Sequence, residues 1–439
     1  RKPCYIIEEK CTGCGLCAEQ CPADAVDAYN MGLTLRRAAF ILYPQSVPKK
    51  FIIDREKCIG CGLCKNRCAA GAVDFEQKET QIDLGVGAVI LAPGLEMYDA
   101  GALAQFGWGR YLNVMTNMEF ERMLSSTGPF ESTVLRVSEG KPPKKVAFIQ
   151  CVGSRDVNHN PYCSSICCTA SVKHAVVARS HDQNIESSIF FMDERFIAKG
   201  SEEYAERNLG SGGLRFIDGR VAEVKGLPGD DLSVVYSDEN ECLRSETFNM
   251  VVLATACVPP PEAVKLASGL GVKLNEHRFC KTGEFSPLET SVSGIFTAGF
   301  FSEPKDIPDS VQQASGCAAK AGVLLSPARF TQVREKEYPK EKDVSNLAPR
   351  IGVFVCHCGT NIGGVVKVPA VVEYARKLPD VVYVESNLFT CSTDTQGRIR
   401  DAIEKYELNR VIVSSCTPRT HEPLFQEIMR DAGLNPYGN

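Results

Sequence analysis

Residues 11–22 read Cys-Thr-Gly-Cys-Gly-Leu-Cys-Ala-Glu-Gln-Cys-Pro, and residues 58–69 read Cys-Ile-Gly-Cys-Gly-Leu-Cys-Lys-Asn-Arg-Cys-Ala. In both stretches the cysteines follow the spacing C-x₂-C-x₂-C-x₃-C, which is typical of a loop wrapped around a 4Fe–4S cluster. One such run can arise by chance, but two in tandem are a specific signal. The two stretches therefore predict a pair of iron–sulfur clusters and a protein that transfers single electrons.

The spacing also predicts which thiolate binds which cluster. In two-cluster ferredoxins, three cysteines of one run hold one cluster and the fourth binds the other. We therefore expect one cluster on Cys11, Cys14, Cys17 and Cys68, and the second on Cys58, Cys61, Cys64 and Cys21. The tight turns of such loops are permitted by four glycines, Gly13, Gly15, Gly60 and Gly62. A zinc ribbon or a disulfide framework is the less specific alternative, because zinc sites usually pair two C-x₂-C knuckles.

Composition limits the class of protein. The chain has 439 residues, 23% of them charged, and a net charge of −5, which is typical of a soluble multidomain protein and gives no sign of nucleic-acid binding. No apolar run approaches the roughly 20 residues that span a bilayer, and no signal peptide begins the sequence. The 21 cysteines in metal-type spacings favour a reducing compartment, and we predict a cytoplasmic location. Because it begins without methionine, we expect the sequence to be an internal piece of a longer polypeptide.

Apolar runs and turn residues divide the chain into four predicted segments. The two-cluster unit covers residues 1–80, an α/β domain covers 81–326, a charged and proline-punctuated linker covers 327–350, and a second α/β module covers 351–439. Within the two α/β segments we expect buried parallel strands at 87–94, 146–150, 251–255, 351–355 and 411–415. Helices are predicted at 118–124, 171–179 and 202–208.

Small-residue turns in segment 81–326 predict a flavin site. Residues 294–299, Gly-Ile-Phe-Thr-Ala-Gly, resemble the closing motif of two-dinucleotide-domain flavoproteins, in which the next helix points its N terminus at the flavin. We expect FAD at Ala92, Gly94, Ala254, Thr255, Gly299, Phe300, Asp309 and Ser310. An ordinary strand–turn–helix unit with a packed alanine helix is the alternative.

The sequence lacks the loop that normally binds a dinucleotide pyrophosphate. No G-x-G-x-x-G follows a strand anywhere in the chain. We therefore expect the flavin loop to lie upstream of residue 1. The same absence argues against direct binding of a nicotinamide cofactor and weakens the hypothesis of a self-sufficient NAD(P)H oxidoreductase.

Two further groups of cysteines are candidate metal sites. At the position of the missing nicotinamide loop stand Cys151, Cys163, Cys167 and Cys168, whose spacing leaves an iron–sulfur cluster and a redox-active thiol pair as equal alternatives. Predicted strand ends in the last module carry Cys356, Cys358, Cys391 and Cys416, for which zinc is the alternative metal. His357 and His421 are candidate ligands there, although solvent-facing histidines are more common. No role is predicted for Cys4, Cys242, Cys257, Cys280 and Cys317.

The chain resembles the family of heterodisulfide reductase A-subunits, including similar subunits of quinone-interacting and class II benzoyl-CoA reductase complexes. Besides the two cysteine runs, the matching segments are 150–156, 162–168, 305–310, 351–364 and 416–423. The resemblance implies a thioredoxin-reductase-like FAD domain interrupted by an inserted α+β ferredoxin domain and followed by a small α/β domain. It also implies a 4Fe–4S cluster at the Cys151 group and suggests another at the Cys356 group.

The resemblance also implies a function. We expect an oxidoreductase subunit that passes electrons between FAD and a chain of 4Fe–4S clusters to partner subunits of a larger anaerobic complex, with flavin-based bifurcation and a homodimeric arrangement as family-level possibilities. The alternative is a non-catalytic iron–sulfur scaffold that assembles such a complex. Phe300 stands where thioredoxin reductases carry an aspartate that binds the flavin ribityl chain, so this contact does not carry over.

Overall fold

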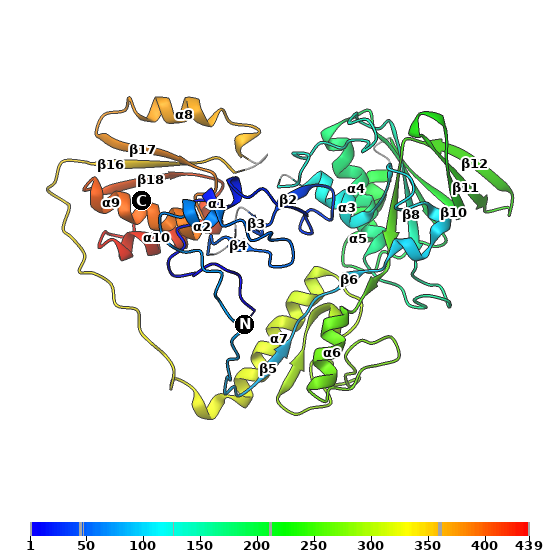
Figure 1. Cartoon of the computed structure of the whole chain (residues 1–439), viewed down its shortest axis with the longest axis horizontal. Coiled ribbons are helices and arrows are strands. Elements are labelled where there is room, and N and C mark those ends of the chain that lie inside the picture. The colour runs from blue at the N-terminus through cyan, green and yellow to red at the C-terminus, as the bar shows by residue number, and fades with distance from the viewer. Residues whose placement is uncertain are drawn as a thin grey trace. The chain divides into compact units, whose positions relative to one another are not determined.

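The computed structural model describes residues 2–43, 46, 48–125, 127–209, 213–358 and 362–437. By its internal contacts the chain separates into two compact units, of which one combines residues 1–82 with 333–439 and the other is residues 83–332. Figure 1 shows the elements of both units. The predicted four-segment division stays a prediction. None of the described helices is both long and apolar enough to cross a membrane.

The two cysteine runs fold as similar loops, each followed by a short helix. Helix α1 (Leu16–Glu19) begins directly after Gly15, and α2 (Leu63–Arg67) begins directly after Gly62. Between the runs lie two small antiparallel pairs, β1 (Asp24–Val26) with β2 (Leu35–Arg37), and β3 (Ala39–Phe40) with β4 (Ile52–Ile53). A small core of Ile6, Ala39, Ile53, Cys64 and Val73 holds both loops together.

Residues 351–437 contain a three-stranded parallel sheet in the order β17–β16–β18. Its strands are β16 (Ile351–Cys356), β17 (Val381–Asn387) and β18 (Arg410–Ser414), and its helices are α8 (Val368–Ala375), α9 (Thr393–Lys405) and α10 (Pro418–Asp431). The predicted strands at 351–355 and 411–415 are thus confirmed. Residues 329–350, all of them described, contain no helix or strand, as expected of a linker.

The second unit is built on a seven-stranded sheet in the order β12–β11–β10–β9–β8–β13–β7. The five strands from β10 to β7 run parallel, whereas β11 and β12 complete an antiparallel meander. The strands are β7 (Val114–Thr116), β8 (Lys145–Val152), β9 (Glu186–Phe191), β10 (Leu214–Gly226), β11 (Leu232–Asp238), β12 (Leu243–Phe248) and β13 (Met250–Thr255). The structure therefore confirms an α/β fold with a parallel sheet.

Both faces of this sheet are covered, which explains the continuous apolar runs in its central strands. Val146 and Phe148 of β8 face a core formed with helices α3 (Asn117–Leu124), α4 (Cys167–His181) and α5 (Ser201–Leu209). Ala147 and Ile149 face a second core beneath the 3-10 helices η1 (Ala100–Ala102) and η2 (Ala104–Phe106). The three predicted helices are confirmed. Helix α4, however, begins at Cys167, four residues before the predicted range 171–179, because the Cys-Cys pair itself forms its first turn.

The remaining part of the second unit lies beside this sheet. Strand β5 (Val89–Leu91) pairs in parallel with β15 (Ile295–Thr297), and β6 (Glu96–Met97) pairs with β14 (Cys257–Val258). Its helices are α6 (Pro261–Gly269) and α7 (Ile307–Leu324), with the 3-10 helices η4 (Gly299–Phe301) and η5 (Ser326–Ala328). A further 3-10 helix, η3 (Pro228–Asp230), precedes β11 of the large sheet.

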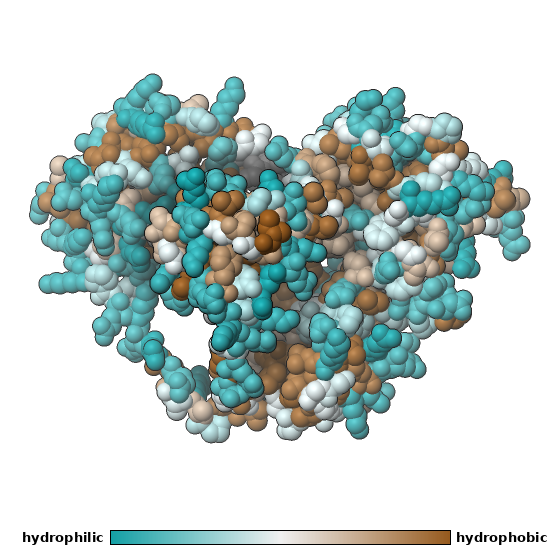
Figure 2. All heavy atoms as spheres, in the orientation of Figure 1, coloured by the Kyte–Doolittle hydropathy of each residue, from teal (hydrophilic) through white to brown (hydrophobic). Residues whose placement is uncertain are grey.

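A parallel strand is confirmed within the predicted range 87–94, but it is shorter than expected and is not buried throughout. Only Val89–Leu91 form β5, and Ile90 is 42% exposed, because the sheet here has two described strands and one open face. Apolar residues of the neighbouring helix α7 are exposed as well, among them Val311 and Val323. Figure 2 shows apolar side chains, in brown, on the surface over α6 and α7 at the bottom of the view.

Candidate functional site

The eight cysteines of the two runs lie around the small core of their unit. Cys64 is buried in it, and Cys11, Cys17, Cys21, Cys58 and Cys68 pack against it, whereas Cys14 and Cys61 are exposed. All four predicted glycines adopt left-handed backbone conformations, with φ values of 70°, 88°, 69° and 76° for Gly13, Gly15, Gly60 and Gly62. At Gly13 a Cβ would lie 2.5 Å from the Lys49 carbonyl oxygen, so a larger residue does not fit there.

Electrostatic coupling among these thiols shows which of them are neighbours. Burial, together with the nearby Cys11, Cys14 and Cys64, raises the pKa of Cys17 to about 11. Burial also raises the pKa of Cys64, with Cys58, Cys61 and Cys21 contributing. Cys21 of the first run thus lies within electrostatic reach of Cys64 in the second. The crossed ligand assignment is compatible with this placement and stays a prediction.

The cysteines at 151, 163, 167 and 168 line a single small cavity, called the cysteine pocket below, which is also lined by Arg155, Ser165 and Arg195. Cys151 belongs to the C-terminal end of β8, and Cys167 and Cys168 open α4. The Cys167 thiol lies 3.9 Å from the carbonyl oxygen of Thr255, at the end of the neighbouring β13. The pocket therefore sits at the carboxyl edge of a parallel sheet, where α/β folds commonly bind ligands.

The chemistry of the cysteine pocket suits a metal cluster. Four thiols supply a complete ligand set for a 4Fe–4S cluster. Burial raises the pKa of Cys151 and Cys167, and it raises that of Cys168 to about 11, with the other thiols of the pocket adding to the effect. Such thiols stay protonated at neutral pH unless a cation displaces the proton.

Sequence reasoning missed a fifth thiol, Cys257, beside this pocket. Its backbone N–H donates to Ser164 Oγ at 2.9 Å, and Tyr162 Oη donates to its carbonyl oxygen at 3.1 Å. Burial, followed by the influence of Cys163, raises its pKa to about 12. Cys257 is distant in sequence and reaches the pocket only through strand β14, so no local pattern could have indicated this contact.

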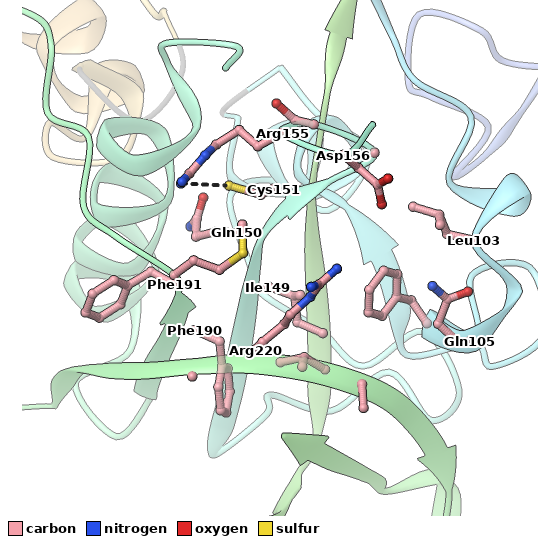
Figure 3. Close-up of a pocket in the computed structure, with 17 residues that line it drawn as sticks. Leu103, Gln105, Ile149, Gln150, Cys151, Arg155, Asp156, Phe190, Phe191 and Arg220 are labelled. Atoms are coloured by element: carbon pink, nitrogen blue, oxygen red, sulfur yellow. Dashed lines mark hydrogen bonds between the residues drawn. The ribbon is translucent and has the colours of Figure 1, made fainter. Parts of the chain in front are cut away.

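Charged residues at the cysteine pocket were also missed. Arg155 Nη1 lies 4.0 Å from Cys151 Sγ, as the dashed line in Figure 3 shows, and the same guanidinium pairs with Asp193. Arg195 Nε donates to the other carboxylate oxygen of Asp193 at 3.0 Å. Asp193 follows β9, so the strand order of the sheet brings these three residues together.

A second cavity of about 220 Å³ borders Cys151 on its other side. Figure 3 shows Arg220, Gln105 and Asp156 around it. Gln150 also lines it and is 8% exposed, and neither polar atom of its side chain has a hydrogen-bond partner among the residues described. This cavity lies at the end of β8, the position that a nicotinamide-binding loop would occupy in this kind of fold.

A larger cavity of about 900 Å³, called the large cavity below, brings together five of the eight predicted flavin residues. They are Ala92, Gly94, Gly299, Phe300 and Ser310. Ala254 and Thr255 do not line it, because they are buried in β13, where Thr255 Oγ1 donates to Asn117 Oδ1 at 3.1 Å. Asp309 is exposed on α7 and also lies outside the lining. Sequence reasoning missed the basic lining residues Lys173, Lys199, Arg207 and Lys305.

The walls of the large cavity fit a flavin. Its volume lies within the range of about 300–1,000 Å³ typical of ligand sites. Gly94 has φ 77°, and a Cβ built there would meet no atom within 4 Å, so its backbone faces open space. Helix α7 presents its first turn to the cavity through Ile307, Pro308 and Ser310, and its positive end favours electronegative groups.

In the last module, Cys356, Cys358, Cys391 and Cys416 lie near the carboxyl ends of the three parallel strands. Burial raises the pKa of Cys358 to about 11, with contributions from Cys356, Cys416 and Cys391. The other three thiols are therefore all within electrostatic reach of Cys358. His357 is exposed, His421 is half-buried on α10, and residues 359–361 of the expected motif, together with the Thr420 side chain, lie outside the described residues.

Within the described ranges, no three Cys, His, Asp or Glu side chains lie close enough together to enclose a single metal ion. This holds for the two cysteine runs, the cysteine pocket and the last module. The zinc alternative for the last module stays open to experiment.

Comparison with known proteins identifies relatives for most of the chain. Residues 10–73 match the family described as a 4Fe-4S dicluster domain. The A-subunit of the H(2):CoB-CoM heterodisulfide,ferredoxin reductase of Methanothermobacter marburgensis is 40% identical over 331 residues, which are 74% of this chain and 50% of that protein. The first iron-sulfur A-subunit of the CoB–CoM heterodisulfide reductase of Methanopyrus kandleri is 41% identical over 341 residues, which are 75% of this chain and 51% of that protein.

The chain thus spans about half the length of the curated relatives it matches. The A-subunit of the ferredoxin:CoB-CoM heterodisulfide reductase of Methanosarcina mazei is 41% identical over 74% of this chain and 42% of its own length. Among solved structures, thioredoxin reductase of Lactococcus lactis in its FR conformation covers 66% of this chain and 86% of that chain, with 16% identity and a TM-score of 0.38.

Proposed function

Because the matched three quarters of the chain belong to the family of heterodisulfide reductase A-subunits, we propose that it is an electron-transfer subunit of an oxidoreductase complex. FAD would occupy the large cavity, and 4Fe–4S clusters would occupy the two cysteine runs, the cysteine pocket and the Cys356 group. Partner redox subunits would supply and accept the electrons, in the cytoplasm. Bifurcation and a homodimeric arrangement stay family-level predictions.

One observation carries this proposal: the large cavity and the cysteine pocket share a wall. Ser165 lines both of them. Cys167 and Cys168 open α4, and the following Thr169, Ala170 and Lys173 line the large cavity. A flavin and a cluster in these two places would be separated by little more than the first turns of one helix, which suits direct electron transfer between them.

The protein's contribution to this function is binding and electrostatic tuning. When bound, FAD exchanges electron pairs with one-electron carriers such as iron–sulfur clusters. The basic residues Lys173, Lys199 and Arg207 on one wall of the large cavity favour an anionic cofactor. The Lys305 ammonium, which also lines this cavity, is buried, donates to Ser302 Oγ at 2.7 Å and pairs with Glu303 at 3.1 Å, and these contacts fix its position.

Quantification of FAD, iron and acid-labile sulfide in the anaerobically purified chain tests the proposal. The decisive variant is Cys168→Ser, and Cys280→Ser is its matched control, because Cys280 is buried in the core beside α6, away from both cavities. We expect Cys168→Ser to lose the iron of one cluster and Cys280→Ser to lose none. Zinc in place of iron, or unchanged iron in Cys168→Ser, would overturn the assignment of this pocket.

Flavin binding separates the enzyme subunit from the scaffold alternative. A scaffold predicts the full iron content with no retained FAD, even after incubation with added FAD. For the electron-transfer subunit, we expect the full-length protein to bind FAD and, after photoreduction of the flavin, to show reduced-cluster signals in electron paramagnetic resonance (EPR) spectra. Those signals should be weaker in Cys168→Ser than in Cys280→Ser.

A further inference from the structure

Arg155 lies beside the thiol of Cys151, and both its side chain and its backbone are fixed by hydrogen bonds. Its guanidinium approaches Cys151 Sγ to 4.0 Å and pairs with Asp193, and its side chain is only 20% exposed. Its backbone N–H donates to the carbonyl oxygen of Tyr162 at 3.0 Å. The loop after β8 is thus tied to the segment that carries Cys163, and the ion pair with Asp193 holds the guanidinium beside the thiol.

The backbone around the cysteine pocket adopts strained conformations that bring the Arg155 guanidinium close to the Cys151 thiol. Cys151 has φ 60°, Arg155 has φ 55° and Ser165 has φ 66°, although none of them is glycine. A non-glycine residue in this conformation is strained and persists where the surroundings enforce it, commonly at functional sites. The positive φ values at Cys151 and Arg155 turn the chain back on itself, so that a side chain four residues later reaches the thiol.

Asp193 completes the arrangement. It accepts from Arg155 through Oδ1 and from Arg195 through Oδ2, the latter at 3.0 Å. Both arginines line the cysteine pocket, but only Arg155 contacts a thiol through its side chain, because Arg195 reaches Cys168 through its backbone N–H. The Arg195 side chain is 44% exposed, so solvent screens its charge more strongly than that of Arg155.

We propose that Arg155 is a positioning residue that raises the reduction potential of the cluster held by the cysteine pocket, and that Asp193 holds its guanidinium in place. The inference rests on the proposed function, because it needs a cluster there. One-electron reduction adds one negative charge to the cluster and breaks no bond. A cationic N–H donor directed at a ligand sulfur stabilises that added charge, since hydrogen bonds and net charge set cluster potentials.

An EPR-monitored redox titration of the full chain tests this directly. The cluster's signal is identified as the one that Cys168→Ser removes. In Arg155→Gln we expect the one-electron equilibrium constant for reduction of this cluster to fall about tenfold. That change corresponds to a fall of about 59 mV in the midpoint potential of the cluster. Arg195→Gln removes the same charge on the other side of Asp193 and is the matched control, with an expected shift of less than half that size. Equal shifts in the two variants would overturn the role of the contact.

Two further variants separate charge from position. Arg155→Lys keeps the charge but loses the planar fork that pairs with Asp193, so we expect an intermediate fall in potential. Asp193→Asn removes a negative charge, which alone would raise the potential, but frees Arg155, which would lower it. We expect a fall, and a rise would overturn the role of Asp193.

Iron content distinguishes failure of this inference from failure of the proposed function. If the wild-type chain carries no cluster in the cysteine pocket, the proposed function fails there. If the cluster is present and its potential is unchanged in Arg155→Gln, only the role of Arg155 fails. If neither Arg155→Gln nor Arg155→Lys retains the cluster, Arg155 serves assembly, and the inference about potential is wrong.

Discussion

His174 Nε2 lies 2.6 Å from Glu121 Oε2, and this contact joins α4 to α3 beneath the sheet. The imidazole is buried between Phe120 and Phe148, and its Nδ1 has no hydrogen-bond partner among the described residues. A neutral ring with its proton on Nε2 satisfies this geometry, because a charged ring would bury an unpaired N–H. Burial accordingly lowers the pKa of His174, although the Glu121 carboxylate opposes that effect.

This arrangement predicts that stability falls as the pH drops below the ordinary histidine pKa of about 6.5. The unfolded chain takes up a proton there that the folded chain does not, so unfolding becomes easier by up to about 1.4 kcal/mol per pH unit. Thermal unfolding measured from about pH 8 to about pH 5 should show this slope in the wild type. We expect His174→Leu to reduce the slope, because the apolar side chain does not titrate.

Glu121→Gln is the control for this prediction. The hydrogen bond from His174, opposed by burial and aided by Lys173, lowers the pKa of Glu121 to about 2. Its stabilising contribution is therefore complete above about pH 4.5 and is lost only as the pH falls towards 2. Glu121→Gln should lower stability by a nearly constant amount between pH 8 and 5. If His174→Leu kept the full wild-type slope, the neutral imidazole would not be its source.

Gln313 holds the turn at the edge of the large cavity. Its Oε1 accepts from the Gly299 backbone N–H at 2.9 Å and from Ser302 Oγ at 3.3 Å. Gln313→Ala leaves the Gly299 N–H unpaired, whereas Ser302 Oγ still donates to the Gly299 carbonyl oxygen at 3.0 Å. Leaving a buried donor unpaired costs about 1–3 kcal/mol. We expect weaker FAD binding, by roughly tenfold for each 1.4 kcal/mol of lost positioning energy, measured by fluorescence titration of the FAD-free chain.

Two neighbouring substitutions control for general damage to α7. Gln312→Ala changes an exposed residue of the same helix and should leave FAD affinity unchanged. Gln313→Glu keeps the acceptor oxygen and should restore most of the affinity that Gln313→Ala loses. Equal losses in Gln312→Ala and Gln313→Ala would show that the turn at Gly299 does not shape the flavin site.

The two cysteine runs allow a direct test of crossed ligation. If Cys21 and Cys64 bind the same cluster, Cys21→Ser and Cys64→Ser should perturb one EPR signal, and Cys17→Ser should perturb the other. Cys4→Ser is the control, because the Cys4 thiol donates to the Ile6 carbonyl oxygen at 3.3 Å and has no predicted metal role. Uncrossed binding would instead make Cys17→Ser and Cys21→Ser affect the same signal.

The sequence was sufficient to predict elements whose pattern is local. The apolar runs indicated β8 and β13, and helices α3, α4 and α5 lie where periodicity placed them. Contacts between individual residues could not be predicted where the order of the strands in the sheet determines which residues meet. Arg155 meets Asp193 because β8 and β9 are neighbours, and Cys257 of β14 meets Ser164, which lies 93 residues earlier in the sequence.

Burial on both faces of a strand explains a further difference. Ala254 and Thr255 resemble a flavin-binding turn in sequence, but both residues are buried in β13 and face packed neighbours. Gly94, which stands in a similar strand-end sequence, borders open space instead. The pattern identifies the strand end correctly but cannot indicate which side of it is covered by other parts of the fold.

Metal binding in the last module should depend strongly on pH. Burial and the neighbouring thiols raise the pKa of Cys358 to about 11, and burial, together with Cys356, also raises that of Cys391. These thiols are protonated near neutral pH without metal, and a bound metal must displace their protons. Affinity should therefore fall as the pH decreases, by up to about tenfold per pH unit for each proton displaced.

The difference in iron content between the wild type and Cys416→Ser isolates this site. After anaerobic reconstitution with iron and sulfide, followed by exposure to a chelator, we expect that difference to equal one cluster at about pH 8.5 and to shrink at about pH 6.5. His421→Ala is the control, because four thiols leave no need for the imidazole. If His421→Ala loses as much metal as Cys416→Ser, and that metal is zinc, the site is a mixed cysteine–histidine zinc centre and carries no electrons.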